Sequence, residues 1–217
     1  MSAPLKLYEL TGSPNNVKVR IALGYKGLNY EREAINLDQF PGDRSKLIAI
    51  SRQPRTPVLE HGKTVIFDSR GILRYLDANF PDTPTLFSTD YAAFGEIEDW
   101  EQWARTTLGG PVGMVFNQAF SPTPDAAVCS QASGMFNDVT AKIEDQLSTT
   151  PFLIGDNLTA ADLACGPVIN LAMLPEAAAA TSPIAAFFHN NFKLGDGRDN
   201  TRGWVTRLMA YDEATRD

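Results

Sequence analysis

A short polar segment, TGSPNNV at residues 11–17, lies between a strand-like run and an apolar helix pattern. Ser13 and Asn15 both carry side chains that can donate hydrogen bonds, and a helix that begins here adds backbone amides without partners inside the helix. Such a group of donors can bind an anion, because the N-terminus of a helix carries a partial positive charge. The same residue types are also favoured as helix caps for local reasons, so the segment alone leaves both interpretations open.

The elements that must position these residues change in character near residue 80. Before it, strand-like runs alternate with helix patterns in an order that begins βαβ, which predicts parallel strands. The expected elements are a strand at 5–10, a helix at 16–26 ended by Gly27, an extended run at 29–37, two strands within 56–67 around the turn at His61-Gly62, and a helix at 68–81.

A linker rich in proline, threonine and serine follows at 81–88, and the pattern after it is helical. Apolar residues at three- and four-residue intervals predict helices at 89–108 and 126–147, and the segment LGGPVGMVF is expected to interrupt the helical pattern after the first of them. Thr159 and Asp162 have the spacing of a capping box at the start of another helix, and a last helix follows Asn200. The predicted fold is a small α/β module followed by an all-helical module.

Composition and charge exclude several classes of protein. The 217 residues carry a net charge of -7, which disfavours a nucleic-acid backbone or an anionic membrane surface as the main partner. The two cysteines, Cys129 and Cys165, show neither disulfide-framework nor metal-ligand spacing, so we expect no metal and a reducing cytoplasm. No signal peptide or membrane-spanning run of apolar residues is expected.

Four motifs in order, SPNNVKVRIAL, TPVLEHG, FDSRGILRYL and FLIGDNLTAADL, resemble those of the cytosolic glutathione transferase family, in its serine-type, bacterial-like form. The resemblance spans almost the whole chain. It implies a thioredoxin-like, glutathione-binding domain at 1–80, a linker at 81–88, and an all-helical domain at 89–217 that contributes a pocket for the electrophile. It also implies a detoxifying transferase with glutathione as co-substrate, a hydrophobic electrophile as its second substrate, and a homodimer.

The resemblance gives the polar segment a chemical purpose. A thiol with a pKa of about 8.5 must be held as a thiolate to act as a nucleophile, and lowering that pKa by two units takes about 2.7 kcal/mol. In the serine-type classes the hydroxyl at the position of Ser13 donates a hydrogen bond to the sulfur, and Asn15 is similar to an asparagine that assists in some members. Tyr8 is the competitor, because a tyrosine near the end of the first strand does this work in the tyrosine-type classes.

The other implied contacts to glutathione come from two later motifs. Pro57 matches the family's cis-proline, and the backbone of Thr56, where the family usually has a bulky aliphatic residue, would pair with the cysteinyl part of glutathione. Arg55 would lie near the glycine carboxylate, although a plain surface arginine is an equal alternative. Asp68 would receive the γ-glutamyl ammonium, and Ser69 at the helix start would bind that residue's carboxylate.

The helical module is less specific. Its aromatic and methionine side chains could line an apolar pocket for the second substrate, although such spacing is more often that of core residues; they are Trp100, Trp103, Met114, Phe116 and Phe120. The alternatives to a transferase are a glutathione-binding regulatory or structural protein without turnover, and a glutathione-dependent lyase, dehalogenase or peroxidase.

Overall fold

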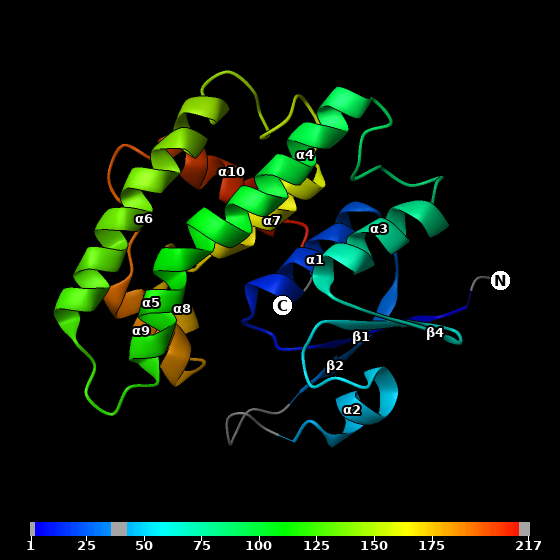
Figure 1. The fold of residues 1–217 in the computed structure, drawn as a ribbon, viewed down its shortest axis with the longest axis horizontal. Helices are drawn as coiled ribbons and strands as arrows, with labels where there is room; N and C mark the ends of the chain where they lie inside the picture. Colours follow the sequence, from blue (N-terminus) through cyan, green and yellow to red (C-terminus); the bar gives the residue numbers. More distant parts are fainter. Residues whose placement is uncertain (1–2, 36–42, 213–217) are drawn as a thin grey trace. The chain divides into compact units, whose positions relative to one another are not determined.

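The computed structural model describes residues 3–35 and 43–212. These residues form two compact units (Figure 1). The first contains the described residues up to Phe87 together with those from Met209 onward, and the second is Ser88–Leu208. Residues 209–212, which fall within the domain expected at 89–217, group with the first unit.

The first unit is built on a four-stranded mixed sheet in the order β2-β1-β3-β4. Its strands are β1 (Leu5–Glu9), β2 (Tyr30–Ala34), β3 (Val58–His61) and β4 (Thr64–Phe67). β1 pairs parallel with β2 and antiparallel with β3, which in turn pairs antiparallel with β4. The predicted parallel pair and hairpin are both confirmed; residues 36 and 37 of the expected extended run lie outside the described residues.

Three helices cover the two faces of this sheet. Figure 1 shows α1 (Pro14–Tyr25) and α3 (Ser69–Asn79) on one face and α2 (Ser45–Ser51) on the other. On the α2 face, Leu47 packs with Tyr8 of β1 and Val58 of β3 in a small buried cluster. The sequence pattern missed α2, a helix of only seven residues.

Helix α1 begins at Pro14, whose fixed φ suits the first helical position, and its C-cap is Lys26, followed by Gly27 at φ 65°. The helix is not amphipathic, because all eight residues from Asn16 to Leu23 are buried. Its C-terminal half also meets the segment after α10: a Cβ at Gly24 would lie 2.0 Å from the carbonyl oxygen of Tyr211. The absence of a side chain at Gly24 is what allows this close approach.

The end of the first unit is held by one carboxylate. Asp77 of α3 accepts hydrogen bonds from the amides of Leu86 and Phe87 at 2.9 to 3.0 Å, and it forms an ion pair with the buried Lys26 ammonium at 2.7 Å. Lys26 also donates to the carbonyl of Pro84 at 2.8 Å. The proline-rich segment after α3 is therefore tied to α1 and α3.

The second unit is helical. Its elements are α4 (Tyr91–Trp103), a π-helical segment at Ala104–Leu108, α5 (Gly109–Ala119), α6 (Ala126–Leu147), α7 (Ala160–Asn170), α8 (Glu176–Ala179), α9 (Pro183–Asn191) and α10 (Asp199–Met209). The predicted fold class, a thioredoxin-like α/β domain followed by a helical one, is confirmed. The sequence did not predict α8 and α9, which are short.

The expected interruption at LGGPVGMVF takes the form of a π-helical segment instead of a break. Gly109 donates its amide to the carbonyl of Ala104, five residues back, and α5 follows directly with Pro111 in its first turn. The wider turn fits a sequence in which Pro111 has no amide to give to the preceding turn. The predicted capping box is confirmed: Thr159 caps α7, and the Thr159 amide donates to the buried Asp162 at 2.8 Å.

Among the described residues, no helix combines the length and the apolar character needed to cross a membrane.

Candidate active site

Ser13 lies at the N-cap of α1, but its hydroxyl does not cap the helix. The Ser13 carbonyl accepts the amides of Asn16 and Val17, at 2.9 and 3.0 Å, and Pro14 has no N–H. Within the described part of the chain, the Ser13 hydroxyl and the NH2 group of the Asn15 side chain donate to no partner. These are two donors at the positive end of a 12-residue helix, available to a bound anion.

A second Ser-Pro helix start in the same chain behaves differently. Ser182 precedes Pro183 at the start of α9, and its side chain accepts the amide of Ala185 at 3.1 Å, as a normal cap does. The backbone of Ser182 is more extended, with φ -159°, than that of Ser13, with φ -79°. Similar local sequences therefore give one hydroxyl that caps a helix and one that does not.

The start of α3 carries the second predicted pair. Asp68 has φ 69°, a conformation that non-glycine residues adopt at a cost of roughly 1 to 3 kcal/mol and that is concentrated at functional sites. Its carboxylate accepts the Arg70 amide at 2.9 Å and is exposed, whereas Ser69 is buried. The strained turn thus presents a free carboxylate oxygen to solvent at the N-terminus of a helix.

The starts of α1 and α3 meet at their side chains. Ser69 donates its hydroxyl to the Asn15 amide oxygen at 3.4 Å, and the Lys18 ammonium lies 3.4 Å from both groups. Lys18 is buried, so it brings a positive charge to the point where these two helices begin. Lys18 is not among the residues predicted from the sequence, where its signal is a lysine between two valines in a helix pattern.

The loop before β3 contains the predicted cis peptide bond, between Thr56 and Pro57, and this prediction is confirmed. Gln53 shapes the loop, because its side chain accepts the Arg55 amide at 2.7 Å and donates to the Arg55 carbonyl at 2.9 Å. The Arg55 side chain is exposed, and its guanidinium forms no hydrogen bond or ion pair in the described ranges. Asn16 of α1 donates to the Thr56 hydroxyl at 3.1 Å, so this loop is also bound to α1.

Tyr8, the alternative to Ser13, forms its hydrogen bond with Glu60. It is only 3% exposed, and its hydroxyl donates to Glu60 at 2.5 Å on the sheet face that α2 covers. Burial and the neighbouring Glu60 carboxylate raise the pKa of Tyr8 above its ordinary value. The Tyr8 hydroxyl therefore already donates its hydrogen to Glu60, and its raised pKa disfavours ionisation, so Tyr8 is poorly suited to stabilise a bound thiolate.

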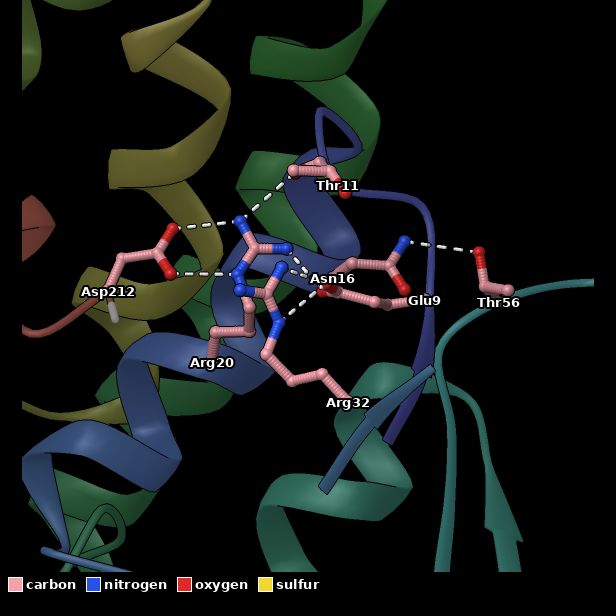
Figure 2. A network of polar contacts seen from close by, with 7 residues as sticks. All are labelled: Glu9, Thr11, Asn16, Arg20, Arg32, Thr56 and Asp212. Atoms are coloured by element: carbon pink, nitrogen blue, oxygen red, sulfur yellow. Dashed lines mark hydrogen bonds and ion pairs between the residues drawn. The ribbon is translucent and has the colours of Figure 1, made fainter. Parts of the chain in front are cut away.

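A buried ionic network around Arg20 contacts the loop at Thr11 (Figure 2). Arg20 of α1 forms a bidentate pair with Asp212 at 2.7 and 2.8 Å, and it also binds Glu9, which Arg32 contacts from β2. Burial opposes the charge of Arg20, but the two carboxylates hold its pKa above the ordinary value. Arg20 also donates to the carbonyl of Thr11 at 3.0 Å, so the network fixes the loop two residues before the serine.

The aromatic residues of the helical unit fall into two groups. Trp100 and Trp103 meet edge to face at 5.3 Å, and the Lys142 ammonium of α6 lies over both rings. Phe116 and Phe120 pair at 4.8 Å, and each is 41% exposed. The tryptophans therefore have partners within the helical unit, whereas the two phenylalanines of the α5 end offer exposed apolar surface.

Metal-ligating groups do not gather anywhere in residues 3–35 and 43–212: no three of His, Cys, Asp and Glu lie close enough together to hold an ion. Cys129 and Cys165 are both free and buried.

Comparison with known proteins finds glutathione transferases by sequence and by structure. The model of the glutathione S-transferase N-terminal domain matches residues 3–78. Glutathione S-transferase 3 of Zea mays is 30% identical over 186 residues, which cover 83% of this chain and 81% of that protein. Among solved structures, poplar glutathione transferase F1 is similar with a TM-score of 0.75 and 21% identity, over 98% of this chain and 97% of that chain. The theta class enzyme of Xanthomonas axonopodis pv. citri, solved with glutathione bound, gives a TM-score of 0.74 and 19% identity over 99% and 96% of the two chains.

Proposed function

Because the chain belongs to the glutathione S-transferase family, its activity is that of a glutathione transferase with glutathione as co-substrate, and we propose that Ser13 activates this thiol. The observation that carries the proposal is that the Ser13 hydroxyl lies at a helix N-terminus and forms no capping hydrogen bond. A hydroxyl in this state is available to donate to a thiolate. The commitment of Tyr8 to Glu60 supports Ser13 over its competitor.

The energy required is within the reach of these donors. Lowering a thiol pKa from about 8.5 by two units takes about 2.7 kcal/mol, and one hydrogen bond to a charged group supplies about 1.5 to 3 kcal/mol. The Asn15 amide and the dipole of α1 add to the hydroxyl, at roughly 0.3 to 1 kcal/mol for the dipole. Ser13 is therefore the main donor in this proposal and Asn15 the second.

The rest of glutathione is held by the two other predicted segments. The Asp68 carboxylate binds the γ-glutamyl ammonium, and Ser69 with its amide binds the carboxylate of the same residue. The Thr56 backbone beside cis-Pro57 pairs with the cysteinyl part, in the manner of an added strand. Arg55, exposed and without a protein partner in the described ranges, is free to reach the glycine carboxylate.

In the reaction, the thiol gives its proton to solvent on binding, and the thiolate attacks an electrophilic carbon. A carbon–sulfur bond forms while the bond to the leaving group breaks, and the leaving group departs with the electron pair. The exposed pair Phe116 and Phe120 is apolar surface suited to a hydrophobic electrophile. The physiological role in this proposal is detoxification in the cytoplasm by a homodimer, in which two buried free cysteines are compatible with a reducing compartment.

The proposed site is tested by Asp68→Asn, which keeps the acceptor for the Arg70 amide but removes the charge. We expect glutathione to bind about tenfold to a hundredfold more weakly, because its ammonium loses its partner. Isothermal titration calorimetry measures the dissociation constant, and turnover with a chloronitrobenzene electrophile measures the activity.

The matched control is Asp90→Asn, since Asp90 caps α4 through the Ala93 amide at 2.9 Å and belongs to the second unit. It should leave the dissociation constant unchanged. If Asp68→Asn binds glutathione as tightly as the wild type, the assignment of the γ-glutamyl contacts is wrong. If glutathione binds but no electrophile is turned over, the site binds the thiol without activating it.

A further inference from the structure

Asn16 joins two segments of the proposed site through two different groups. Its backbone amide donates to the Ser13 carbonyl at 2.9 Å, and its side-chain amide donates to the Thr56 hydroxyl at 3.1 Å. Figure 2 shows the second bond reaching from α1 to the loop that leads into β3. One residue therefore holds both the residue that donates to the sulfur and the residue whose backbone binds the cysteinyl part of glutathione.

This arrangement is costly for the fold. Asn16 is 0% exposed, and its Oδ1 atom is buried without a hydrogen-bond partner among the described residues. A buried polar atom without a partner destabilises the folded state, whereas replacing such a group by an apolar one of the same shape is often neutral or stabilising. Leucine branches at the same carbon as asparagine, and its apolar methyl groups would suit a helix whose neighbouring residues, Val17 and Val19, are buried and apolar.

We propose that Asn16 is a positioning residue, which fixes the cis-proline loop relative to the Ser13 turn and does so at the expense of stability. This inference rests on the proposed function and deepens it. When the cysteinyl backbone of glutathione is bound at Thr56, the sulfur lies at a distance from Ser13 that depends on how the loop is seated against α1. The Asn16–Thr56 bond sets that seating, so it decides how well the hydroxyl meets the sulfur.

The pairing also explains the residue type at position 56. A hydroxyl is needed there to accept from Asn16, and threonine supplies it while retaining the β-branched shape that suits an extended backbone. Valine has the same shape without the hydroxyl. Thr56→Val therefore removes the link and leaves the packing of the loop almost unchanged.

The test compares Asn16→Leu, Thr56→Val and the double variant with the wild type. Three quantities are measured: the pKa of the thiol in the glutathione complex, by the pH dependence of thiolate absorbance; the dissociation constant of glutathione; and the thermal midpoint of unfolding. We expect both single variants to raise the bound thiol pKa by about half a unit, which is a threefold loss of thiolate below that pKa, and to weaken glutathione about threefold. Asn16→Leu should unfold at the same temperature as the wild type or a higher one.

The double variant should be no worse than the single ones, because each removes the same bond. The control is Thr140→Val, which removes a buried hydroxyl that donates to the Asn137 carbonyl at 3.2 Å in the second unit. It should lower the unfolding temperature and leave the thiol pKa unchanged.

The proposal is overturned if Asn16→Leu lowers the unfolding temperature while the thiol pKa and the dissociation constant keep their wild-type values, since Asn16 would then serve only the fold. If Asn16→Leu does not fold, Thr56→Val alone tests the proposal, through the thiol pKa and the dissociation constant of glutathione. If the wild-type complex shows no depressed thiol pKa, the proposed role of Ser13 fails. The positioning role is then judged by the dissociation constant, which must still rise about threefold in Thr56→Val.

Discussion

Replacing Ser13 by alanine separates two roles that a serine at a helix start can have. The hydroxyl makes no capping bond, so its loss should not cost the 0.5 to 2 kcal/mol that the removal of a cap typically costs, and unfolding should change little. The same substitution removes one donor to the bound thiolate, worth about 1.5 to 3 kcal/mol, which corresponds to a rise of roughly one to two units in the pKa of bound glutathione. Glutathione affinity should change little, because most contacts lie elsewhere.

The assay is the thiolate absorbance of the glutathione complex titrated against pH, in wild type, Ser13→Ala and Tyr8→Phe. Ser182→Ala is the matched control, since Ser182 precedes a proline at a helix start and does form the capping bond, to Ala185 at 3.1 Å. Ser182→Ala should lower the free energy of unfolding by about 1 kcal/mol and leave the thiol pKa unchanged, which is the reverse of what we expect for Ser13→Ala.

Three results would refute parts of this reasoning. A titration that moves in Tyr8→Phe but not in Ser13→Ala identifies a tyrosine-type enzyme, in spite of the bond from Tyr8 to Glu60. A loss of stability in Ser13→Ala as large as that in Ser182→Ala, with no change in the thiol pKa, identifies Ser13 as a cap. A shift of only a few tenths of a unit identifies Asn15 and the dipole of α1 as the main stabilisers.

Two further predictions concern one carboxylate inside each unit. Asp212→Asn leaves the buried Arg20 with Glu9 as its remaining carboxylate, so the free energy of unfolding should fall by about 3 kcal/mol in urea titrations; a value within 0.5 kcal/mol of wild type would show that the pair contributes nothing. Burial of Glu144 opposes its ionisation, but hydrogen bonds from the Thr201 hydroxyl and the amides of Thr201 and Asn200 lower its pKa below the ordinary 4.5, so its contribution is present above that pH and is lost as the pH falls through the lowered value. Glu144→Gln should therefore unfold more easily at pH 7 and show a weaker loss of stability on acidification below about pH 4.5, whereas an unchanged acid profile would contradict the linkage.

Local signals in the sequence were sufficient for the four strands and for the longer helices. Gly27 and Gly62 mark the end of α1 and the β3–β4 turn, and both adopt the positive φ that favours glycine. The long helix α6 coincides with the predicted range 126–147, because apolar periodicity sustained over six turns is a strong signal. Short helices such as α2 and α8 have too few residues to show a period.

The polar residues of α1 could not be interpreted from their own segment. Asparagine, lysine and arginine side chains are mostly exposed in folded proteins, whereas Asn16, Lys18 and Arg20 are all buried. What makes their burial possible lies far along the chain: Thr56 for Asn16, Ser69 for Lys18, and Asp212 for Arg20. A partner 192 residues away leaves no periodicity or motif by which a single sequence could identify it. Ser13 and Ser182 make the same point, since both precede a proline at a helix start but differ in backbone angles.

The bond between Arg20 and Asp212 also has a consequence for how this protein is made. The ribosome completes β1, α1 and β2 early, but the carboxylate that neutralises their buried arginine is 192 positions later. At roughly 5 to 20 residues per second, translation of the intervening 192 residues takes about 10 to 40 s. During that time the nascent N-terminal unit holds a guanidinium that lacks its bidentate partner, and the Thr11 turn before Ser13 is held only by an incomplete network. The network beside the thiol site is therefore completed by a residue that leaves the ribosome long after nearly all residues of the site itself.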